Sequence, residues 1–395
     1  MNQYRMMPLN ENVEEMFIGP FGSSLKNECF VPVDEAFCMV YEQKHAIQKT
    51  MNVDTRYVNK EKYNELQRFN VIGGDIIVSC RGTIGETFIV PDDAPMGIMH
   101  PSIMKIRLKE GVYNKFYFNK LLTTRLKKHK NEANGSGIKM AISATSLGKE
   151  LFPVPTLEEQ QEIAETLDKL QSIITHRRTQ LEKLDLLVKA RFVEMFGDSS
   201  KYNIEQLKNN VEEMFIGPFG SALKSEYFVD EKDAYCMVYE QKHAIQKTLN
   251  LPTRYVDKEK YNELKRFTVL GNDIIISCRG TIGEIYSIPK DAPMGIMHPS
   301  IMKIRLNKEK YRNLFFTIML EQYMQNSMTK AKGSGVKMAV TATELGKEFF
   351  IVPSIEEQKT FENFVKQVDK SKVAVQKALD EAQLLFDSLM QEYFG

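Results

Sequence analysis

The sequence predicts an α+β protein in which two similar globular target-recognition domains are joined by two long helices that form an antiparallel coiled coil. Three observations support this fold class. The chain repeats itself without a gap after 198 residues, so that Tyr4 aligns with Tyr202 and Phe196 with Phe394. Each copy ends in a stretch that has neither Pro nor Gly, and apolar residues in both stretches recur with a heptad spacing.

Both long stretches carry a helix start signal. Thr156 and Glu159 follow Pro155, and Ser354 and Glu357 follow Pro353, which is the spacing of a capping box. At about 1.5 Å per residue each helix would be roughly 60 Å long. A single helix cannot bury such an apolar stripe by itself, so we expect the two helices to pack on each other. The predicted core positions are Ile163, Leu167, Leu170, Ile174, Leu181, Leu184, Val188, Phe361, Val365, Val368, Val375, Leu379, Ala382, Phe386 and Leu389, with Arg177 and Lys372 as charged interruptions.

These signals give four segments: a first domain at 1–155, a first helix at 156–197, a second domain at 198–353 and a second helix at 354–395. The globular copies are far more alike than the helices. Similar domains are expected to bind the same kind of target, whereas helices that pack together need complementary side chains.

Composition argues against a membrane protein, a disulfide-rich protein and a strongly basic protein. With 43% hydrophobic residues the chain can form ordinary cores, and no apolar run is long enough for a membrane span, so a cytoplasmic protein is expected. The net charge is only +1, so phosphate contacts would have to come from local patches. The five cysteines lack CxxC spacing, and no disulfide framework or metal site is predicted.

No catalytic motif is present. The chain has no phosphate-binding GxxxxGK[ST] loop and no HExxH, and it lacks the Asn/Asp-Pro-Pro-aromatic tetrapeptide of amino-methyltransferases. We therefore expect a protein without catalytic residues and without a cofactor of its own.

The first candidate binding element is the turn Gly19-Pro20-Phe21-Gly22. Ser23 and Lys26 follow it, as Ser221 and Lys224 follow the second copy. Free backbone amides, a hydroxyl and a lysine could bind a DNA phosphate. An ordinary turn explains the pattern equally well.

The second candidate element follows a predicted strand at 37–41. The polar run after it, Glu42-Gln43-Lys44-His45, is identical in the second copy, where it includes Gln241, Lys242 and His243. Gln can pair with adenine and Lys can donate to guanine, so these residues are candidate base readers. The alternative is a solvated loop.

A β-hairpin is predicted over Gly74–Pro91, with Arg81 at its turn and Gly85 at a bulge or a close approach. Arg279 takes the same place in the second copy. Each guanidinium could bind a guanine or a phosphate, or could pair with a nearby carboxylate.

The remaining candidates are basic. A strand after His100-Pro101 alternates so that Lys105 and Arg107 share one face, as do Lys303 and Arg305. We predict phosphate contacts there, and the alternative is a face that is simply solvated. A helix is expected over 113–130. A glycine loop then carries Lys139, or Lys337 in the second copy, as a further backbone contact.

Three motifs occur in the same order in both copies: GPFGSSLK, GDIIVSCRGTIG and GSGIKMAISATSLGKELFPVPTLEEQQEI in the first copy, with close equivalents in the second. Together with the long helix that follows them, they resemble the specificity subunit of type I restriction-modification systems. The resemblance covers essentially the whole chain. It implies two domains that each read half of a bipartite double-stranded DNA site, with the helices setting the gap. It also implies two adenine methyltransferase subunits that use S-adenosylmethionine, and motor-nuclease subunits that use ATP and Mg where a restriction subunit is present.

The chain departs from the usual family pattern because its two domains are close copies. We therefore expect a palindromic site with similar, inverted halves about one helical turn apart. A non-catalytic coiled-coil adaptor for a symmetric protein partner is the alternative function.

Overall fold

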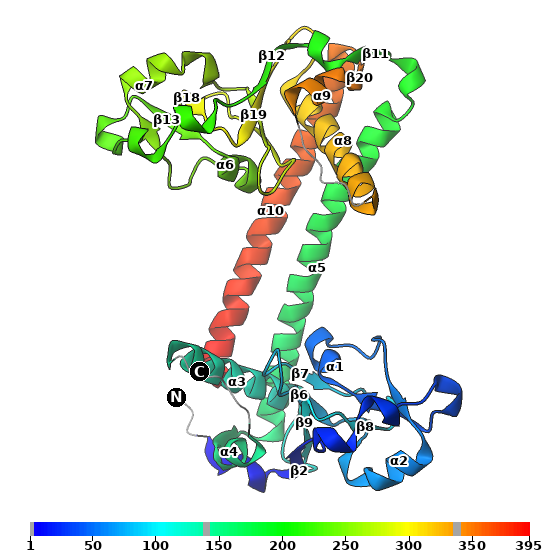
Figure 1. The fold of residues 1–395 in the computed structure, drawn as a ribbon. Coiled ribbons are helices and arrows are strands. Elements are labelled where there is room, and N and C mark those ends of the chain that lie inside the picture. The colour runs from blue at the N-terminus through cyan, green and yellow to red at the C-terminus, as the bar shows by residue number, and fades with distance from the viewer. Residues whose placement is uncertain (1–3, 137–142, 335–340) are drawn as a thin grey trace. The chain divides into compact units, whose positions relative to one another are not determined.

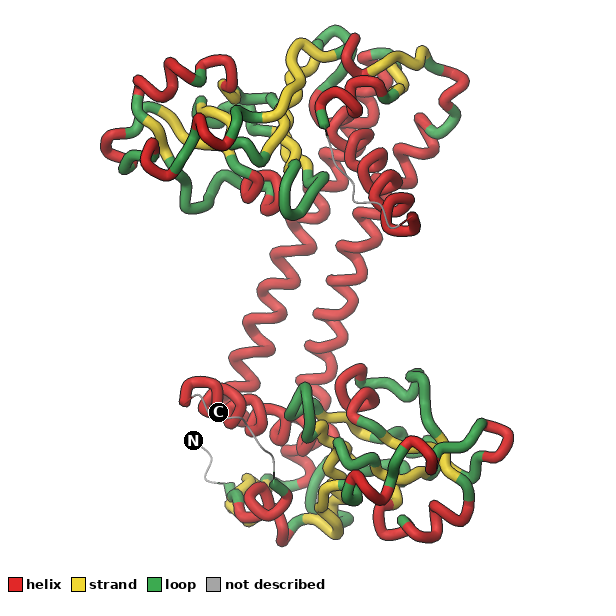
Figure 2. Tube along the Cα trace, in the orientation of Figure 1, coloured by secondary structure: helices red, strands yellow, loops and turns green. Residues whose placement is uncertain are grey.

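The computed structural model describes residues 4–136, 143–334 and 341–395. The chain divides into two compact units: unit 1 comprises Met1–Thr179 and Gln376–Gly395, and unit 2 comprises Gln180–Val375. Each unit contains one copy of the globular repeat and a segment of each long helix (Figure 1). Strands and short helices alternate within each globular part (Figure 2).

Two four-stranded sheets form the globular part of unit 1. The first is antiparallel and has the order β2-β9-β6-β7; the second has the order β4-β3-β8-β5, with β3 parallel to β8. A separate antiparallel pair joins β1 to β10. The strands are β1 Arg5–Pro8, β2 Val13–Ile18, β3 Cys38–Tyr41, β4 Tyr57–Val58, β5 Asn70–Val71, β6 Ile76–Ser79, β7 Thr87–Ile89, β8 Gly97–Met99, β9 Ile103–Leu108 and β10 Leu151–Val154.

Both faces of the central strand β9 are covered. Met104 and Ile106 point into a core with α3 and the long helices, whereas Ile103 belongs to a core shared with the second sheet. The helices of this part are α1 Gln43–Gln48, α2 Lys60–Glu65, α3 Lys115–Ser136 and α4 Ala144–Lys149.

Unit 2 repeats this topology, with sheet orders β12-β19-β16-β17 and β14-β13-β18-β15 and the pair β11-β20. Its elements are β11 Asn203–Gln206, β12 Val211–Ile216, β13 Cys236–Tyr239, α6 Gln241–Gln246, β14 Tyr255–Val256, α7 Lys258–Glu263, β15 Thr268–Val269, β16 Ile274–Ser277, β17 Ile285–Ser287, β18 Gly295–Met297, β19 Ile301–Leu306, α8 Asn313–Ser334, α9 Ala342–Lys347 and β20 Phe349–Val352.

Local predictions from the sequence agree with these elements. The hairpin predicted over Gly74–Pro91 is formed by β6 and β7, and Gly85 adopts a positive φ of 88°. The helix expected over 113–130 is α3, which starts at Lys115 and continues to Ser136. Among the described residues, no helix is long and apolar enough to cross a membrane, and no group of His, Cys, Asp or Glu could hold a metal ion.

The two long helices begin where the capping boxes predict. Helix α5 spans Leu157–Phe196 and α10 spans Ile355–Phe394. The backbone N–H of Thr156 donates to Glu159 at 2.9 Å, while Glu159 N–H donates back to Thr156 Oγ1 at 3.3 Å. Ser354 and Glu357 make the same pair of bonds, at 3.0 and 3.3 Å.

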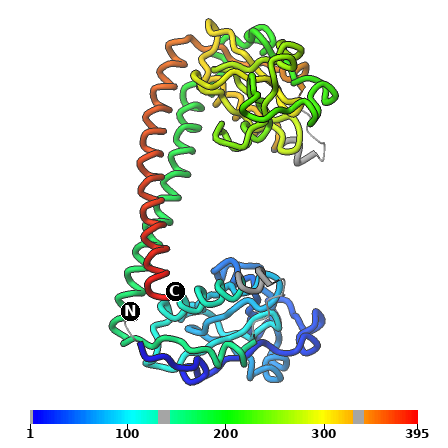
Figure 3. Tube along the Cα trace, turned by 90° about the vertical axis from the view of Figure 1, so that its left-hand side faces the viewer, coloured from blue at the N-terminus to red at the C-terminus, as the bar shows by residue number. Residues whose placement is uncertain are grey.

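Segments of α5 and α10 lie side by side within each unit (Figure 3). In unit 1, Ile163 and Leu167 share a core with Phe394, and Arg178 Nη2 donates to Gln383 at 3.3 Å. Rising numbers on α5 therefore meet falling numbers on α10, so these segments run antiparallel. In unit 2, Phe192 of α5 packs against Phe361 of α10.

Every predicted helix-core residue is at least half-buried. The buried ones are Ile163, Leu167, Ile174, Val188, Phe361, Val365, Val368, Val375, Leu379 and Ala382, and the half-buried ones are Leu170, Leu181, Leu184, Phe386 and Leu389. The charge of Lys372 is accommodated by an ion pair to Asp185 of α5 at 2.7 Å, a contact within unit 2.

The aromatic cluster around Phe361 predicts a large stability effect. This ring is fully buried, with its centroid 5.6 Å from Phe192 and 5.7 Å from Phe196. We expect Phe361→Ala to lower the free energy of unfolding by about 3–5 kcal/mol, because it leaves a cavity that the helices cannot fill. Leu384→Ala, at a position 73% exposed on α10, should change it by about 0.5 kcal/mol or less. Urea unfolding followed by circular dichroism tests the pair; equal effects would contradict the packing.

Candidate nucleic-acid interface

Four segments of unit 1 meet at the end of the first sheet where β2 and β6 finish and β9 begins. Strands β2 and β6 both pair with β9, with Ile18 opposite Met104 and Ser79 opposite Ile103. The chain leaving β2 and the chain leaving β6 therefore flank the start of β9, roughly 10 Å apart. We call this set of loops the loop edge; it comprises residues 19–26, 42–45, 80–85 and 100–102, and in unit 2 residues 217–224, 240–243, 278–283 and 298–300.

Backbone hydrogen bonds fix these loops to one another. Gly19 N–H donates to Ile103 O at 2.9 Å, Cys80 N–H to Ser102 O at 2.8 Å, and His100 N–H to Tyr41 O at 2.9 Å. Unit 2 repeats the three bonds at 2.9, 2.8 and 2.8 Å. The side chains of the loop edge thus project from a rigid frame, which suits a surface that must match another molecule.

Gln43 lies against the turn of the hairpin. A Cβ added to Gly82 would lie 3.8 Å from Gln43 Nε2, and in unit 2 a Cβ on Gly280 would lie 3.6 Å from Gln241 Nε2. The Oε1 atom of each glutamine is buried without a hydrogen-bond partner among the described residues. A buried acceptor left unpaired costs free energy, so this oxygen can take a donor from a bound molecule.

Arg81 and Arg279 are exposed at the hairpin turns. No carboxylate of the described chain lies within ion-pair distance of either guanidinium. The alternative in which Arg81 is tied to a neighbouring acid therefore does not hold for these residues. Both guanidinium groups can donate hydrogen bonds to a phosphate or to the edge of a base.

Lys44 is half-buried and takes part in an ion-pair network around the buried carboxylate of Glu42. Its Nζ lies 2.8 Å from Glu42, which also receives a hydrogen bond from Arg56; Lys242 lies 2.7 Å from Glu240. Burial raises the pKa of Glu42, but the bonds from Arg56 and Lys44 outweigh it, so the pKa lies below its usual value. Lys44 can reach a base only by leaving this carboxylate.

Arg56 was not among the residues predicted from the sequence. Its guanidinium stacks over the Phe30 ring at 4.0 Å and bonds Glu42, and Arg254 does the same with Phe228 at 4.2 Å. The one sequence signal that could have found it is its identity in both copies.

The base-reading role predicted for His45 and His243 does not fit the structure. Both imidazoles are fully buried, and each Nδ1 accepts the backbone N–H of the glutamate three residues earlier, at 3.0 Å for Glu42 and 2.9 Å for Glu240. This local bond starts the short helix α1, so the polar run at 42–45 is a helix beginning and not the solvated loop of the alternative. Burial lowers the pKa of His45, which keeps the ring neutral.

The phosphate contacts predicted for Lys105, Arg107, Lys303 and Arg305 are likewise wrong. The alternation along β9 is as expected, but the second sheet covers the face that carries Lys105, which is 0% exposed and paired with Glu15. Arg107 donates twice to Asp75, at 2.7 and 2.8 Å. In unit 2 Lys303 pairs with Glu213 and Arg305 with Asp273.

The predicted backbone contacts Ser23, Lys26, Ser221 and Lys224 are all exposed on the loop edge. Lys26 lies 3.8 Å from Glu28 and Lys224 lies 3.9 Å from Glu226. Such exposed pairs contribute about 0–1 kcal/mol, so both ammonium groups can exchange their partner for a phosphate. Lys139 and Lys337 lie outside the described residues.

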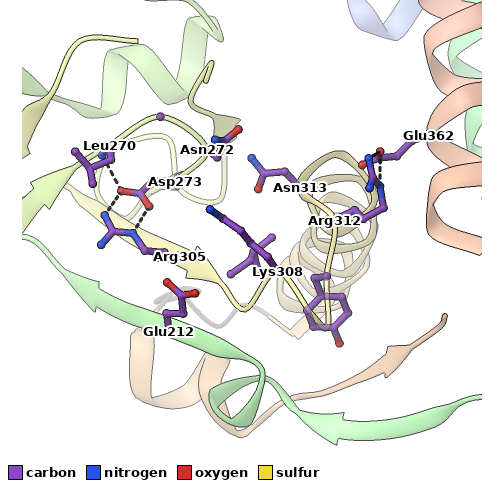
Figure 4. A pocket seen from close by; sticks show the side chains of 12 residues that line it. Glu212, Leu270, Asn272, Asp273, Arg305, Lys308, Arg312, Asn313 and Glu362 are labelled. Atoms are coloured by element: carbon purple, nitrogen blue, oxygen red, sulfur yellow. Dashed lines mark hydrogen bonds and ion pairs between the residues drawn. The ribbon is translucent and has the colours of Figure 1, made fainter. Parts of the chain in front are cut away.

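A hollow of about 570 Å³ in unit 2 is a poor candidate for the site (Figure 4). Its acids Glu212, Asp273 and Glu362 balance its bases Arg305, Lys308 and Arg312. Asp273 binds Arg305, and Glu362 binds Arg312 at 2.6 Å. The hollow also adjoins the C-terminal end of β19, whereas the loop edge adjoins its beginning.

Comparison with known proteins gives a consistent result. The family model described as "Type I restriction modification DNA specificity domain" matches residues 11–184 and again residues 225–382. The specificity subunit of the type I restriction enzyme EcoBI from Escherichia coli is 24% identical over 344 residues, which cover 80% of this chain and 71% of that protein. A protein of Methanocaldococcus jannaschii, named for the specificity subunit of a type I restriction enzyme MjaX, is 23% identical over 326 residues, covering 79% and 76%.

Two solved structures share the fold. A chain from a type I R-M system studied for its complex assembly aligns with a TM-score of 0.65, covering all of this chain and 98% of that one at 14% identity. The S subunit of a type I restriction-modification system from M. genitalium aligns with a TM-score of 0.55, covering all of this chain and 97% of that one, also at 14% identity.

The buried histidines predict a pH dependence of stability. Burial lowers the pKa of His45 and His243 below the ordinary value of 6.5, so the unfolded chain takes up protons first as the pH falls. Their contribution to stability is complete above about pH 6.5 and decreases below it, by at most about 1.4 kcal/mol per pH unit for each ring. Titration of Glu42 falls in a separate window, below its ordinary value of 4.5.

We expect the double change His45→Asn and His243→Asn to reduce the slope of unfolding free energy against pH between 6.5 and 5. The Asn amide oxygen can still accept the backbone N–H that caps the helix. Urea unfolding at each pH gives the slope, and His176→Asn, at an exposed position on α5, is the control. An unchanged slope in the double variant would show that these rings titrate normally.

Proposed function

The chain belongs to the type I restriction modification DNA specificity domain family, and on this premise we propose that it reads a bipartite, palindromic DNA site and positions adenine methyltransferase subunits on it. Members of this family are the non-catalytic DNA-recognition component of restriction-modification systems. The observation that carries the proposal is the loop edge: the same exposed arginine and the same unpaired glutamine acceptor occur in both units.

The loop edge supports two kinds of DNA contact. Gln43 and Gln241 have the donor and acceptor needed for a bidentate pair with adenine, and Arg81 and Arg279 have the fork that suits guanine. Lys44 and Lys242 would join them only after exchanging their glutamate. Phosphate contacts, which fix register but carry no sequence information, fall to Ser23, Lys26, Ser221 and Lys224.

Similar, inverted half-sites follow from the repeat. Near-identical loop edges should prefer near-identical bases. The segments of α5 and α10 run antiparallel within each unit, which supports a two-fold relation between copies and hence a palindrome. In this proposal the helices form one continuous coiled coil that sets the gap between the halves.

The chemistry belongs to partner subunits. Two adenine methyltransferase subunits would bring S-adenosylmethionine, and ATP and Mg enter only with a motor-nuclease subunit. A coiled-coil adaptor for a symmetric protein is the second candidate function. It accounts for the helices. It gives no role to the two matched loop edges, where the Oε1 atoms of Gln43 and Gln241 lack a hydrogen-bond donor and the exposed Arg81 and Arg279 lack an acidic partner among the described residues.

The methylome tests the proposal directly. Cells that express this chain with its neighbouring methyltransferase should acquire modified adenine in one new bipartite motif with inverted, near-identical halves. Direct sequencing of modified bases measures it, with the methyltransferase alone as control. Unlike halves would contradict the palindrome, and no new motif under good co-expression would favour the adaptor.

Variants of the loop edge separate reading from phosphate binding. Because Gln43 Oε1 lacks a partner in the free protein, Gln43→Ala with Gln241→Ala should leave stability unchanged while lowering discrimination by about 1–3 kcal/mol per half-site. Lys26→Gln should weaken binding to all sequences and reduce the salt slope by about one. Competition binding at several salt concentrations measures both, and Lys169→Gln, at an exposed position on α5, is the control. An equal loss for all sequences in the glutamine variant would exclude base reading.

A further inference from the structure

One aromatic ring in each copy is exposed to an unusual degree. Phe21 is 85% exposed and Phe219 is 88% exposed, the two highest values among the large hydrophobic residues that the structure describes. Singly exposed apolar side chains are common on protein surfaces, so the exposure is informative here because of its place: the same ring stands on the loop edge in both copies.

The rings are held outward by a fixed loop. Pro20 is buried before Phe21, and Leu25, 4% exposed, anchors the chain after it. Gly19 packs so tightly on the next loop that an added Cβ would lie 2.3 Å from His100 O. Gly217 repeats this contact with His298, also at 2.3 Å. These contacts hold the chain on both sides of each ring, and the loop presents the ring to the outside.

Phe21 belongs to the loop edge. It leaves β2 beside the start of β9, and Arg81 leaves β6 on the other side of the same strand. The residues that follow it, Gly22 and Ser23, are also exposed, and exposed Lys26 lies a few residues further on. The ring is thus isolated among small, polar and basic groups. A protein–protein interface would centre on a contiguous apolar patch, whereas a single ring beside cations suits a charged polymer with flat apolar faces.

We propose that Phe21 and Phe219 are wedges that insert their rings against DNA bases, one in each half-site, and partly unstack the neighbouring base step. This inference rests on the proposed DNA-reading function and adds a contact that neither hydrogen-bonding nor phosphate-binding residues supply. Apolar side chains placed between base steps unstack and kink a duplex, and the deformation is easiest at flexible pyrimidine–purine steps. The wedge therefore contributes to sequence choice without a hydrogen bond.

The test uses the complex of the full chain with its co-expressed methyltransferase and a duplex that contains its methylation site. 2-Aminopurine replaces one base at a time, and its fluorescence rises when a base loses its stacking neighbours. The wild-type complex should give a rise at one step in each half-site. Phe21→Ala with Phe219→Ala should abolish both rises and lower affinity by about tenfold or more, whereas the matched change to Leu, also an apolar wedge, should keep most of the signal.

Single variants provide an internal check. A palindromic site accepts the complex in two orientations, so Phe21→Ala alone should leave about half of the signal in each half-site. Phe116→Ala removes another exposed ring, at the start of α3, and should change nothing.

The outcomes separate this inference from the proposed function. If the wild-type complex does not select its site over competitor DNA, the proposed function fails. If it does, but the double Ala variant keeps the fluorescence rise, or the Leu variant behaves like the Ala variant, only the wedge is overturned. If the Ala variant no longer co-purifies with the methyltransferase while the fluorescence of the bound remainder is unchanged, the rings contact protein and the wedge is likewise overturned.

Discussion

The position of β9 between β2 and β6 determines which side chains of each globular part are available to a partner. Because both neighbours run antiparallel to β9, their C-terminal ends flank its first residue, Ile103. The loop of Phe21 and the turn of Arg81 are thereby brought to one edge, although they are far apart in the sequence. The second sheet, covering the other face of β9, turns Lys105 into a core residue. One strand thus creates the loop edge and removes the basic strand face from it.

The same arrangement gives the basic residues two kinds of ion pair, which differ in the free energy needed to break them. Removing one partner of a buried ion pair costs about 3–5 kcal/mol, so Lys105 and Arg107 are committed to Glu15 and Asp75. The exposed pair of Lys26 with Glu28 contributes about 0–1 kcal/mol. A DNA phosphate can replace the second kind of partner and not the first. Exposure, rather than the number of basic residues, therefore decides where DNA can bind on a chain whose net charge is only +1.

Sequence patterns predicted the elements whose signals are local. The capping boxes located the starts of α5 and α10, and the alternation of the β6–β7 segment gave the hairpin with its positive-φ Gly85. Burial of His45 and Lys105 was not predictable in this way, since each depends on what packs over a strand or helix end. A period-two pattern states that two residues share a face but not whether a second sheet covers it. The structure therefore removes several predicted members from the candidate site, whose location stays a prediction.

Where the two copies differ also bears on what they read. The exposed Lys127 and Lys128 near the middle of α3 correspond to Gln325 and Asn326 on α8. The contact that seats this helix on the hairpin is kept nevertheless: an added Cβ on Gly85 would meet Leu126 at 3.5 Å, and one on Gly283 would meet Met324 at 3.0 Å. The copies thus differ in charge on these helices, outside the loop edge, while the loop edges themselves have the same geometry. Because cations that bind phosphates add affinity without sequence information, unequal helices are compatible with equal half-sites.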